Sequence, residues 1–316
     1  MLYYTDFVFK ENRSEKKEDK KMGGWQSTTS DQPVQPDLEY SKPWRKTPWG
    51  EEKQLDKSLR EFKLTVPNSK HVRILVIGEV GAGKSSFINS VNSVFQKRIT
   101  NEALVNKISD STTFTKLYKT YYIRYGQSTL PFVLTDTMGL ESQDLHGIHP
   151  DDVVKAMEGC IKERYKFNPA SPVSPQDESY RSNPSLQDQT YCLVFVMPAD
   201  KISLMNENVI KKMKYIKNKA NELEIPQVVI MTRADEVCPL VKENIRKIYT
   251  SKKIKEKLEE CSECMGIPVS HVFPVKSYHE EIDTQADIDV LILRALTHIV
   301  QVANDALTLK SKENTE

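Results

Sequence analysis

A glycine-rich run that ends in lysine and serine is the part of this sequence best suited to chemistry. Residues 78–86 read Gly-Glu-Val-Gly-Ala-Gly-Lys-Ser-Ser and match the pattern G-x-x-x-x-G-K-S. Glycines let the backbone curl around an anion, and N–H groups at the start of a helix hold phosphate. Lys84 can reach the β- and γ-phosphates of a nucleotide, and the Ser85 hydroxyl can ligate Mg²⁺. The predicted phosphate site comprises Gly78, Gly81, Ala82, Gly83, Lys84, Ser85 and Ser86.

A D-x-x-G pattern, residues 136–139, follows the apolar run 130–135. An acid at the carboxyl end of a neighbouring strand can hold the water shell of Mg²⁺, and the Gly139 N–H can meet a γ-phosphate. The hydroxyl-rich segment 110–115 lies between the two motifs, where a threonine can sense the γ-phosphate and Mg²⁺. Several hydroxyls compete for that role, so the assignment stays open between two threonines. The predicted Mg²⁺ ligands are Ser85, Asp136, and Thr112 or Thr113.

The segment T-R-x-D at residues 232–235 indicates which base the nucleotide carries. The Asp235 carboxylate can accept hydrogen bonds from guanine N1–H and from its 2-amino group, whereas adenine would leave the carboxylate unpaired. Arg233 stands where GTPases usually have lysine, and its planar guanidinium stacks well on rings. A further apolar run, 272–275, leads into a loop placed to touch the base edge. The predicted base site comprises Thr232, Arg233, Asp235 and Lys276.

The elements that must position these motifs can be read from the hydrophobic pattern. Apolar runs precede each motif, and helical patterns separate the runs, for example at 153–161, 209–220 and 288–306. This order predicts an α/β fold: a doubly wound, mostly parallel sheet of the P-loop GTPase type with helices on both faces. Alternating apolar residues at 117–123 predict an antiparallel edge strand. Ligands then bind at the carboxyl ends of the strands, where the motifs lie.

The pattern also predicts how the chain is divided. Residues 1–38 are polar and charged, which predicts a disordered tail, and residues 39–68 read as a Trp/Pro-rich arm with a short helix at 51–62. The arm can be a packed linker or a regulatory element. Residues 69–306 then form the G domain, with a proline-rich insertion at 168–188 that we expect to be a mobile surface loop. Residues 307–316 read as a polar tail.

Composition excludes some function classes. The chain has 316 residues with a formal net charge of +1, so no global charge favours nucleic acid as a partner. No segment reaches the apolar length of a membrane span, and we expect no lipid anchor, because Leu2 stands where myristoylation needs glycine and the C-terminus carries no prenylation box. The five cysteines are an odd number, which favours free thiols in a reducing compartment.

Together these segments resemble the interferon-induced protein 44 family, which consists of P-loop GTPase-like proteins. The resemblance runs from about Pro43 to about Asp305. It rests on residues 43–45, 72–75, 85–91, 112–116, 130–140, 232–239 and 266–270. The resemblance implies a cytoplasmic, interferon-responsive protein that binds GTP or GDP with Mg²⁺ and acts in antiviral innate immunity. Some relatives have a further N-terminal domain, where this chain has a short polar segment.

Catalysis is less clear from the sequence than binding. Efficient small GTPases place glutamine directly after D-x-x-G to orient the attacking water, and this chain has Leu140 there. We therefore expect slow intrinsic hydrolysis. His146, His149 or Gln143, an arginine from another molecule, or a homodimer across the nucleotide face could supply what Leu140 lacks. Three interpretations stay open: a GTP-binding switch with weak or dimer-stimulated GTPase activity, a non-enzymatic nucleotide-bound scaffold, and an ATPase. The catalytic residues are not assigned.

Overall fold

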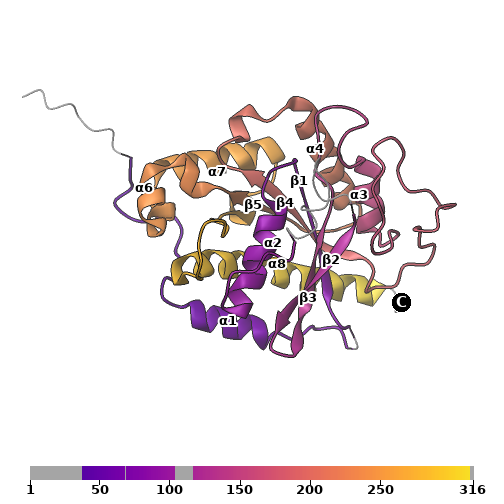
Figure 1. Cartoon of the computed structure of the whole chain (residues 1–316), viewed down its shortest axis with the longest axis horizontal. Helices are drawn as coiled ribbons and strands as arrows, with labels where there is room; N and C mark the ends of the chain where they lie inside the picture. Colours follow the sequence, from indigo (N-terminus) through magenta and orange to yellow (C-terminus); the bar gives the residue numbers. More distant parts are fainter. Residues whose placement is uncertain (1–37, 68, 104–116, 314–316) are drawn as a thin grey trace, which may run out of the picture. The chain divides into compact units, whose positions relative to one another are not determined.

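One sheet of six strands lies at the centre of the part of the chain that the computed structural model describes, residues 38–67, 69–103 and 117–313 (Figure 1). The strand order is β2-β3-β1-β4-β5-β6. All neighbouring strands are parallel except β2, which runs antiparallel to β3 at one edge. The predicted fold class and antiparallel edge strand are therefore confirmed. The strands are β1 (Val72–Gly78), β2 (Lys119–Tyr125), β3 (Ser128–Asp136), β4 (Thr190–Pro198), β5 (Gln227–Thr232) and β6 (Val272–Pro274).

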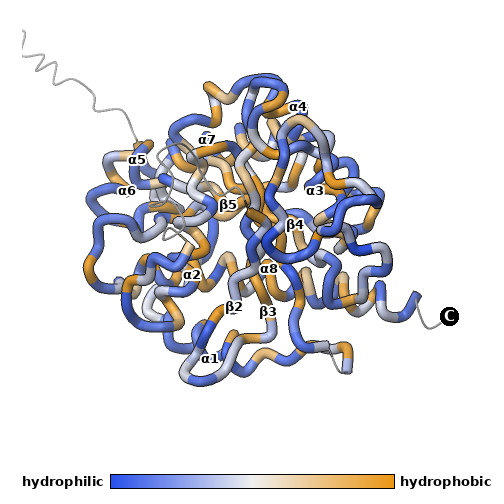
Figure 2. Tube along the Cα trace, turned by 45° about the vertical axis from the view of Figure 1, so that its right-hand side comes forward, coloured by the Kyte–Doolittle hydropathy of each residue, from blue (hydrophilic) through white to orange (hydrophobic). Residues whose placement is uncertain are grey.

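Helices cover both faces of the sheet, because alternate side chains of each buried strand point to opposite faces. Along β1, Ile74 and Val76 belong to one apolar cluster, whereas Leu75 and Ile77 belong to the other. The first cluster includes residues of α1 (Glu52–Arg60), α2 (Lys84–Gln96) and α8 (Ala286–Glu313). The second includes residues of α3 (Pro150–Met157), α4 (Glu207–Glu222), α5 (Ala234–Val237), α6 (Pro239–Glu243) and α7 (Lys252–Met265). Figure 2 shows hydrophobic residues gathered on the strands, with hydrophilic ones outside.

Two helix boundaries differ from the prediction. The helix predicted at 153–161 ends at Met157, because Gly159 follows with φ +84° and turns the chain, and Ile161 instead pairs with Tyr180. The helix predicted at 288–306 continues to Glu313. Its buried stripe also continues, since Leu307 is only 1% exposed. The predicted polar tail is therefore wrong for residues 307–313, and residues 314–316 lie outside the described part.

The arm before α1 packs on the domain. The Trp44 ring meets the Tyr249 ring edge to face at 5.0 Å. The Arg45 guanidinium donates to the carbonyl oxygen of Val272, the first residue of β6, at 2.8 Å and to that of Val269, before the strand, at 2.7 Å. The short helix expected at 51–62 is α1. The predicted tail at 1–38 lies almost wholly outside the described residues.

The insertion 168–188 contains neither helix nor strand, but its backbone is anchored to the domain. The Val173 N–H donates to Asp152 Oδ1 at 2.7 Å, and the Asp152 side chain is buried in α3. The Arg181 guanidinium donates to the Gly159 carbonyl at 2.7 Å and lies 3.2 Å from Asp188 Oδ1. The Val173 contact joins the insertion to the first turn of α3, and the Arg181 contact with Gly159 joins it to the turn just after α3.

The buried carboxylate of Asp152 should make the stability of the protein depend on pH. Burial raises the pKa of Asp152 from 3.8 to about 6. The folded state therefore holds the Asp152 proton more tightly than the unfolded chain does. The contribution of Asp152 to the free energy of unfolding falls as the pH rises from 3.8 through about 6. Asp152→Asn keeps an oxygen for Val173 and buries no charge. We expect the variant to melt at a higher temperature than the parent at about pH 7.5, and the gain to shrink at about pH 4.5.

Asp177 in the same insertion is the control for this measurement. Hydrogen bonds from the Ser174 backbone N–H and hydroxyl lower the pKa of Asp177, so Asp177→Asn should show no such gain near neutral pH. A melting-temperature difference between Asp152→Asn and the parent that does not change with pH would contradict the prediction.

None of the helices in the ranges that the structure describes is long and apolar enough to cross a bilayer. All five cysteines are free thiols, and all but Cys264 are buried.

Candidate functional site

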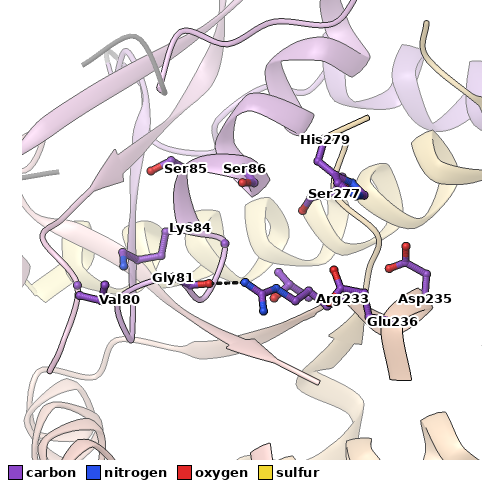
Figure 3. A pocket seen from close by; sticks show the side chains of 13 residues that line it. Val80, Gly81, Lys84, Ser85, Ser86, Arg233, Asp235, Glu236, Ser277 and His279 are labelled. Carbon is purple, nitrogen blue, oxygen red and sulfur yellow. Dashed lines mark hydrogen bonds between the residues drawn. The ribbon is translucent and has the colours of Figure 1, made fainter. Parts of the chain in front are cut away.

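A cavity of about 460 Å³ opens where the loops after β1, β3, β5 and β6 meet at the carboxyl ends of the strands. Its size suits a nucleotide-sized ligand. In the close-up view, Lys84 and Ser85 lie towards one end, and Asp235, Ser277 and His279 lie towards the other (Figure 3). The lining residues are Val80, Gly81, Gly83, Lys84, Ser85, Ser86, Gly139, Thr232, Arg233, Asp235, Glu236, Ser277 and His279.

The loop between β1 and α2 needs its glycines for two different reasons. At Gly78, a Cβ atom would lie 2.4 Å from the Val196 carbonyl oxygen, so no side chain fits between β1 and β4 there. At Gly83, the N-cap of α2, φ is +98°, a conformation that residues with a side chain rarely adopt. The Lys84 ammonium folds back over this loop and donates to the Gly78 and Glu79 carbonyl oxygens, each at 3.2 Å. The loop thus surrounds a positive charge that can turn towards phosphate.

Two of the predicted Mg²⁺ ligands lie next to each other. The Ser85 hydroxyl donates to Asp136 Oδ2 at 3.0 Å, and the other Asp136 oxygen accepts the Thr137 N–H at 3.0 Å. Both side chains are buried, at 8% and 0% exposed. Hydroxyl and carboxylate oxygens are the donors that Mg²⁺ takes beside nucleotide phosphates. The donor set therefore fits this ion. Thr112 and Thr113 lie outside the described residues.

The D-x-x-G segment is joined to the phosphate loop by backbone contacts. The Leu140 N–H donates to the Gly78 carbonyl, and the Val80 N–H donates to the Leu140 carbonyl, both at 3.0 Å. A Cβ atom at Gly139 would lie 2.8 Å from the Val80 Cα atom, so this close approach requires glycine. The Leu140 side chain is 0% exposed and belongs to the core cluster with α3 and α4. Its side chain is therefore held in the core and away from the cavity.

The three residues considered as substitutes for glutamine do not line the cavity. His149 Nδ1 accepts the Asp151 N–H at 3.2 Å and caps the start of α3. The His146 side chain is 58% exposed, with its Nδ1 atom 4.0 Å from Glu141. The Gln143 carbonyl accepts a hydrogen bond from Lys212 at 3.1 Å. In this conformation His149 has a structural role, and none of the three is placed to orient a water in the cavity.

The end of β5 is tied directly to the phosphate loop. The Thr232 hydroxyl donates to the Ala82 carbonyl at 2.7 Å. Arg233 has φ +56°. One of its guanidinium nitrogens donates a hydrogen bond to the Gly81 carbonyl oxygen at 2.8 Å, the dashed bond in Figure 3, and another donates to Asp200 Oδ2 at 3.1 Å. Arginine has more donors than lysine, and it uses them here to bridge a carbonyl and a carboxylate. This bridge fixes its stem beside the cavity.

Lys276, which the sequence predicted as part of the base site, lies beside an acid that lines the cavity. Lys276 does not line the cavity. Its ammonium lies 2.8 Å from Glu281 Oε1 and 3.7 Å from Asp235 Oδ2. Burial opposes ionisation of Glu281, but the Lys276 ammonium and backbone N–H groups outweigh it and lower the pKa of Glu281 to about 2. The lysine therefore lies between two acids, of which Asp235 lines the cavity.

Most of the predicted site residues come together. Nine line the cavity: Gly81, Gly83, Lys84, Ser85, Ser86, Gly139, Thr232, Arg233 and Asp235. Gly78, Ala82, Asp136 and Lys276 contact the lining residues without being part of the lining. Sequence reasoning missed Val80, Glu236, Ser277 and His279. Val80 and Glu236 lie inside or next to a motif, and the other two lie in the loop after β6 that was expected near the base.

Comparison with known proteins agrees with this geometry. The family described as "50S ribosome-binding GTPase" matches residues 73–233. Human interferon-induced protein 44 is 34% identical over 81% of this chain, and human interferon-induced protein 44-like is 31% identical over 79%. This chain covers 57% and 55% of their respective lengths, so it spans little more than half of these relatives.

A solved structure also aligns with the chain. Toc33 from Arabidopsis thaliana in complex with Mg²⁺ and GMPPNP covers 81% of this chain and 91% of its own, at 16% identity and a TM-score of 0.44. The family match includes the loop after β1 and the D-x-x-G segment, and it ends within T-R-x-D at Arg233, before Asp235. The chain therefore belongs to the GTPase family with that description, and its resemblance to the interferon-induced protein 44 family is confirmed.

Proposed function

We propose that this protein binds GTP or GDP with Mg²⁺ in the cavity and acts as a guanine-nucleotide switch with weak or dimer-stimulated GTPase activity. One observation carries the proposal: the phosphate loop, the D-x-x-G segment and T-R-x-D all meet at a single cavity. The matching GTPase family supports it. The relatives' names support an interferon-induced protein, and we extend this to a cytoplasmic role in antiviral innate immunity.

Each part of the nucleotide is bound by a different group of the protein. Lys84 and the N–H groups of the loop and of α2 bind the β- and γ-phosphates. Ser85 and Asp136 hold Mg²⁺, which neutralises phosphate charge when it is bound, and Thr112 or Thr113 completes its shell. The Gly139 N–H meets the γ-phosphate. Arg233 supports the base with its stem, and the Asp235 carboxylate accepts from guanine N1–H and the 2-amino group.

A panel of nucleotides tests this binding. Thermal unfolding with GTP, GDP and ATP, each with Mg²⁺, should show stabilisation by the two guanine nucleotides and little by ATP. Equal stabilisation by ATP would favour the ATPase interpretation and remove Asp235 from base selection. No stabilisation by any nucleotide would contradict the proposed function.

A nucleotide-bound scaffold without turnover is the second candidate. The buried Leu140 side chain favours it, since the position that orients water in efficient small GTPases points into the core here. Under this interpretation bound nucleotide stabilises a conformation that other proteins recognise. Turnover measurements separate the two candidates.

We predict slow GTP hydrolysis in dilute protein. Neither Leu140 nor any of His146, His149 and Gln143 lines the cavity, so no such group orients the attacking water. If a homodimer across the nucleotide face completes the site, the rate per molecule should rise with protein concentration. The measurement is single-turnover hydrolysis over about a hundredfold range of protein concentration.

Two results would change the assignment of turnover. A flat rate near zero, with GTP still bound, would favour the scaffold. A fast rate independent of concentration would show that the monomer completes its own site by a movement that brings one of these residues to the cavity.

A further inference from the structure

Lys276 and Glu281 form a charged pair just behind the base end of the cavity. The Lys276 ammonium lies 2.8 Å from Glu281 Oε1, and the two side chains are 23% and 9% exposed. The same ammonium lies 3.7 Å from Asp235 Oδ2, whose side chain is 12% exposed. Among these three side chains only Asp235 lines the cavity. The pair is thus linked to the cavity through the carboxylate proposed to recognise guanine.

Glu281 also organises the loop that forms the cavity wall. Its second oxygen, Oε2, accepts the His279 backbone N–H at 3.1 Å and the Glu280 N–H at 3.3 Å. His279 and Ser277, in the same loop, line the cavity. One carboxylate therefore holds Lys276 with one oxygen and the wall loop with the other.

The contacts on Lys276 restrict what it can do. Lysine is a flexible point charge on a four-carbon stem, and unheld it could turn towards a ligand. Here two carboxylates lie close to its ammonium, at 2.8 Å and 3.7 Å. If the Lys276 ammonium left these carboxylates to contact a neutral base, it would exchange two ionic contacts for one weaker hydrogen bond. The arrangement favours an indirect role for the lysine.

We propose that Lys276 and Glu281 are positioning residues for base selection: Glu281 holds Lys276, and Lys276 fixes the Asp235 carboxylate at the cavity so that it can accept from both donors of guanine. The inference rests on the proposed function, because it assigns a role in recognising the base of a bound guanine nucleotide. It replaces the direct base contact that the sequence suggested for Lys276.

A comparison of GTP with ITP separates the two roles of Lys276. Hypoxanthine keeps the O6 oxygen and the N1–H of guanine but lacks the 2-amino group. A lysine that contacted O6 directly would help both nucleotides equally. A lysine that orients Asp235 favours GTP, because only guanine uses both carboxylate contacts. The GTP-to-ITP affinity ratio is therefore the readout.

The experiment measures Kd for GTP and ITP, with Mg²⁺, in the full chain and in variants. Lys276→Met removes the ammonium and keeps an unbranched stem, and Glu281→Gln removes the charge and keeps the shape. We expect GTP affinity to fall about tenfold in each, with a smaller fall for ITP, so that the ratio drops. The double variant should add little, because the two act as one unit. Lys276→Arg should restore most of the ratio.

A surface pair of the same type is the control. Lys247 lies 3.1 Å from Glu39, away from the cavity lining, so Lys247→Met should leave both affinities unchanged. If Lys276→Met does not fold, as judged by circular dichroism, the near-isosteric Glu281→Gln supplies the same comparison.

The remaining outcomes would overturn the inference. Equal losses for GTP and ITP would indicate a direct contact with the shared oxygen. Unchanged affinities with a lower melting temperature would indicate a purely structural pair. In either case the parent protein still binds GTP and the proposed function stands. A parent that binds neither nucleotide contradicts the proposed function itself, and with it this inference.

Discussion

Asp235→Asn should move the nucleotide preference of this protein from GTP towards XTP. Asp235 lines the cavity, and its carboxylate offers only acceptors, which suit guanine N1–H and the 2-amino group. Asparagine keeps one acceptor and replaces the other with a donor amide, which matches the N1–H and 2-oxygen of xanthine. We expect GTP affinity to fall about 10- to 100-fold, since hydrogen bonds to charged groups contribute about 1.5–3 kcal/mol each. XTP affinity should rise in the same competition assay.

The surface acid Asp287 provides a matched control. Its carboxylate lies 2.8 Å from the Arg246 guanidinium and does not line the cavity, so Asp287→Asn should not alter base preference. An Asp235→Asn protein that still chose GTP over XTP as the parent does would remove Asp235 from the guanine site. Because Lys276 also loses an ionic partner in this variant, the melting temperature without nucleotide should be measured alongside.

Local patterns were enough to predict the sheet and the gathering of motifs. Val76 and its neighbours form an unbroken apolar run because β1 is buried on both faces, and such runs mark central strands. Tyr121 and Ile123 alternate with polar residues because β2 lies at the edge. Parallel strands place their carboxyl ends at one edge, so the order of motifs alone predicted that Lys84 and Asp235 would share a cavity.

Contacts between distant residues could not be predicted in the same way. Arg233 meets Asp200, 33 residues away, and no pattern in the sequence marks that pair. Leu140 occupies the position of a water-orienting residue, but two backbone hydrogen bonds to the phosphate loop turn its side chain into the core. Nothing in the sequence indicates that Glu281 lies 2.8 Å from the Lys276 ammonium. Each of these contacts depends on where a side chain points, which is set by tertiary packing rather than by motif or period.

Lys84→Ala should weaken GTP binding about tenfold or more, a loss of about 1.4 kcal/mol or larger. Lys84 begins α2, lines the cavity and is 7% exposed. Because little water surrounds its ammonium, the attraction between this charge and phosphate is only weakly screened. Its ammonium now contacts the Gly78 and Glu79 carbonyls and can exchange these for phosphate oxygens. The backbone N–H groups of the loop remain in the variant, so binding should be weakened rather than abolished. Isothermal titration with GTP and Mg²⁺ measures the change.

The interpretation of Lys84→Ala depends on separating lost charge from a collapsed loop. The variant loses two hydrogen bonds to loop carbonyls, so its melting temperature without nucleotide must be compared with that of the parent. Lys57→Ala removes a lysine whose side chain is 72% exposed in α1, and it should bind GTP as the parent does. A Lys84→Ala protein that is folded and binds GTP as tightly as the parent would show that this glycine-rich loop does not work as a phosphate site. A folded variant with weakened GTP binding, beside an unchanged Lys57→Ala, would locate the loss in the charge at the start of α2.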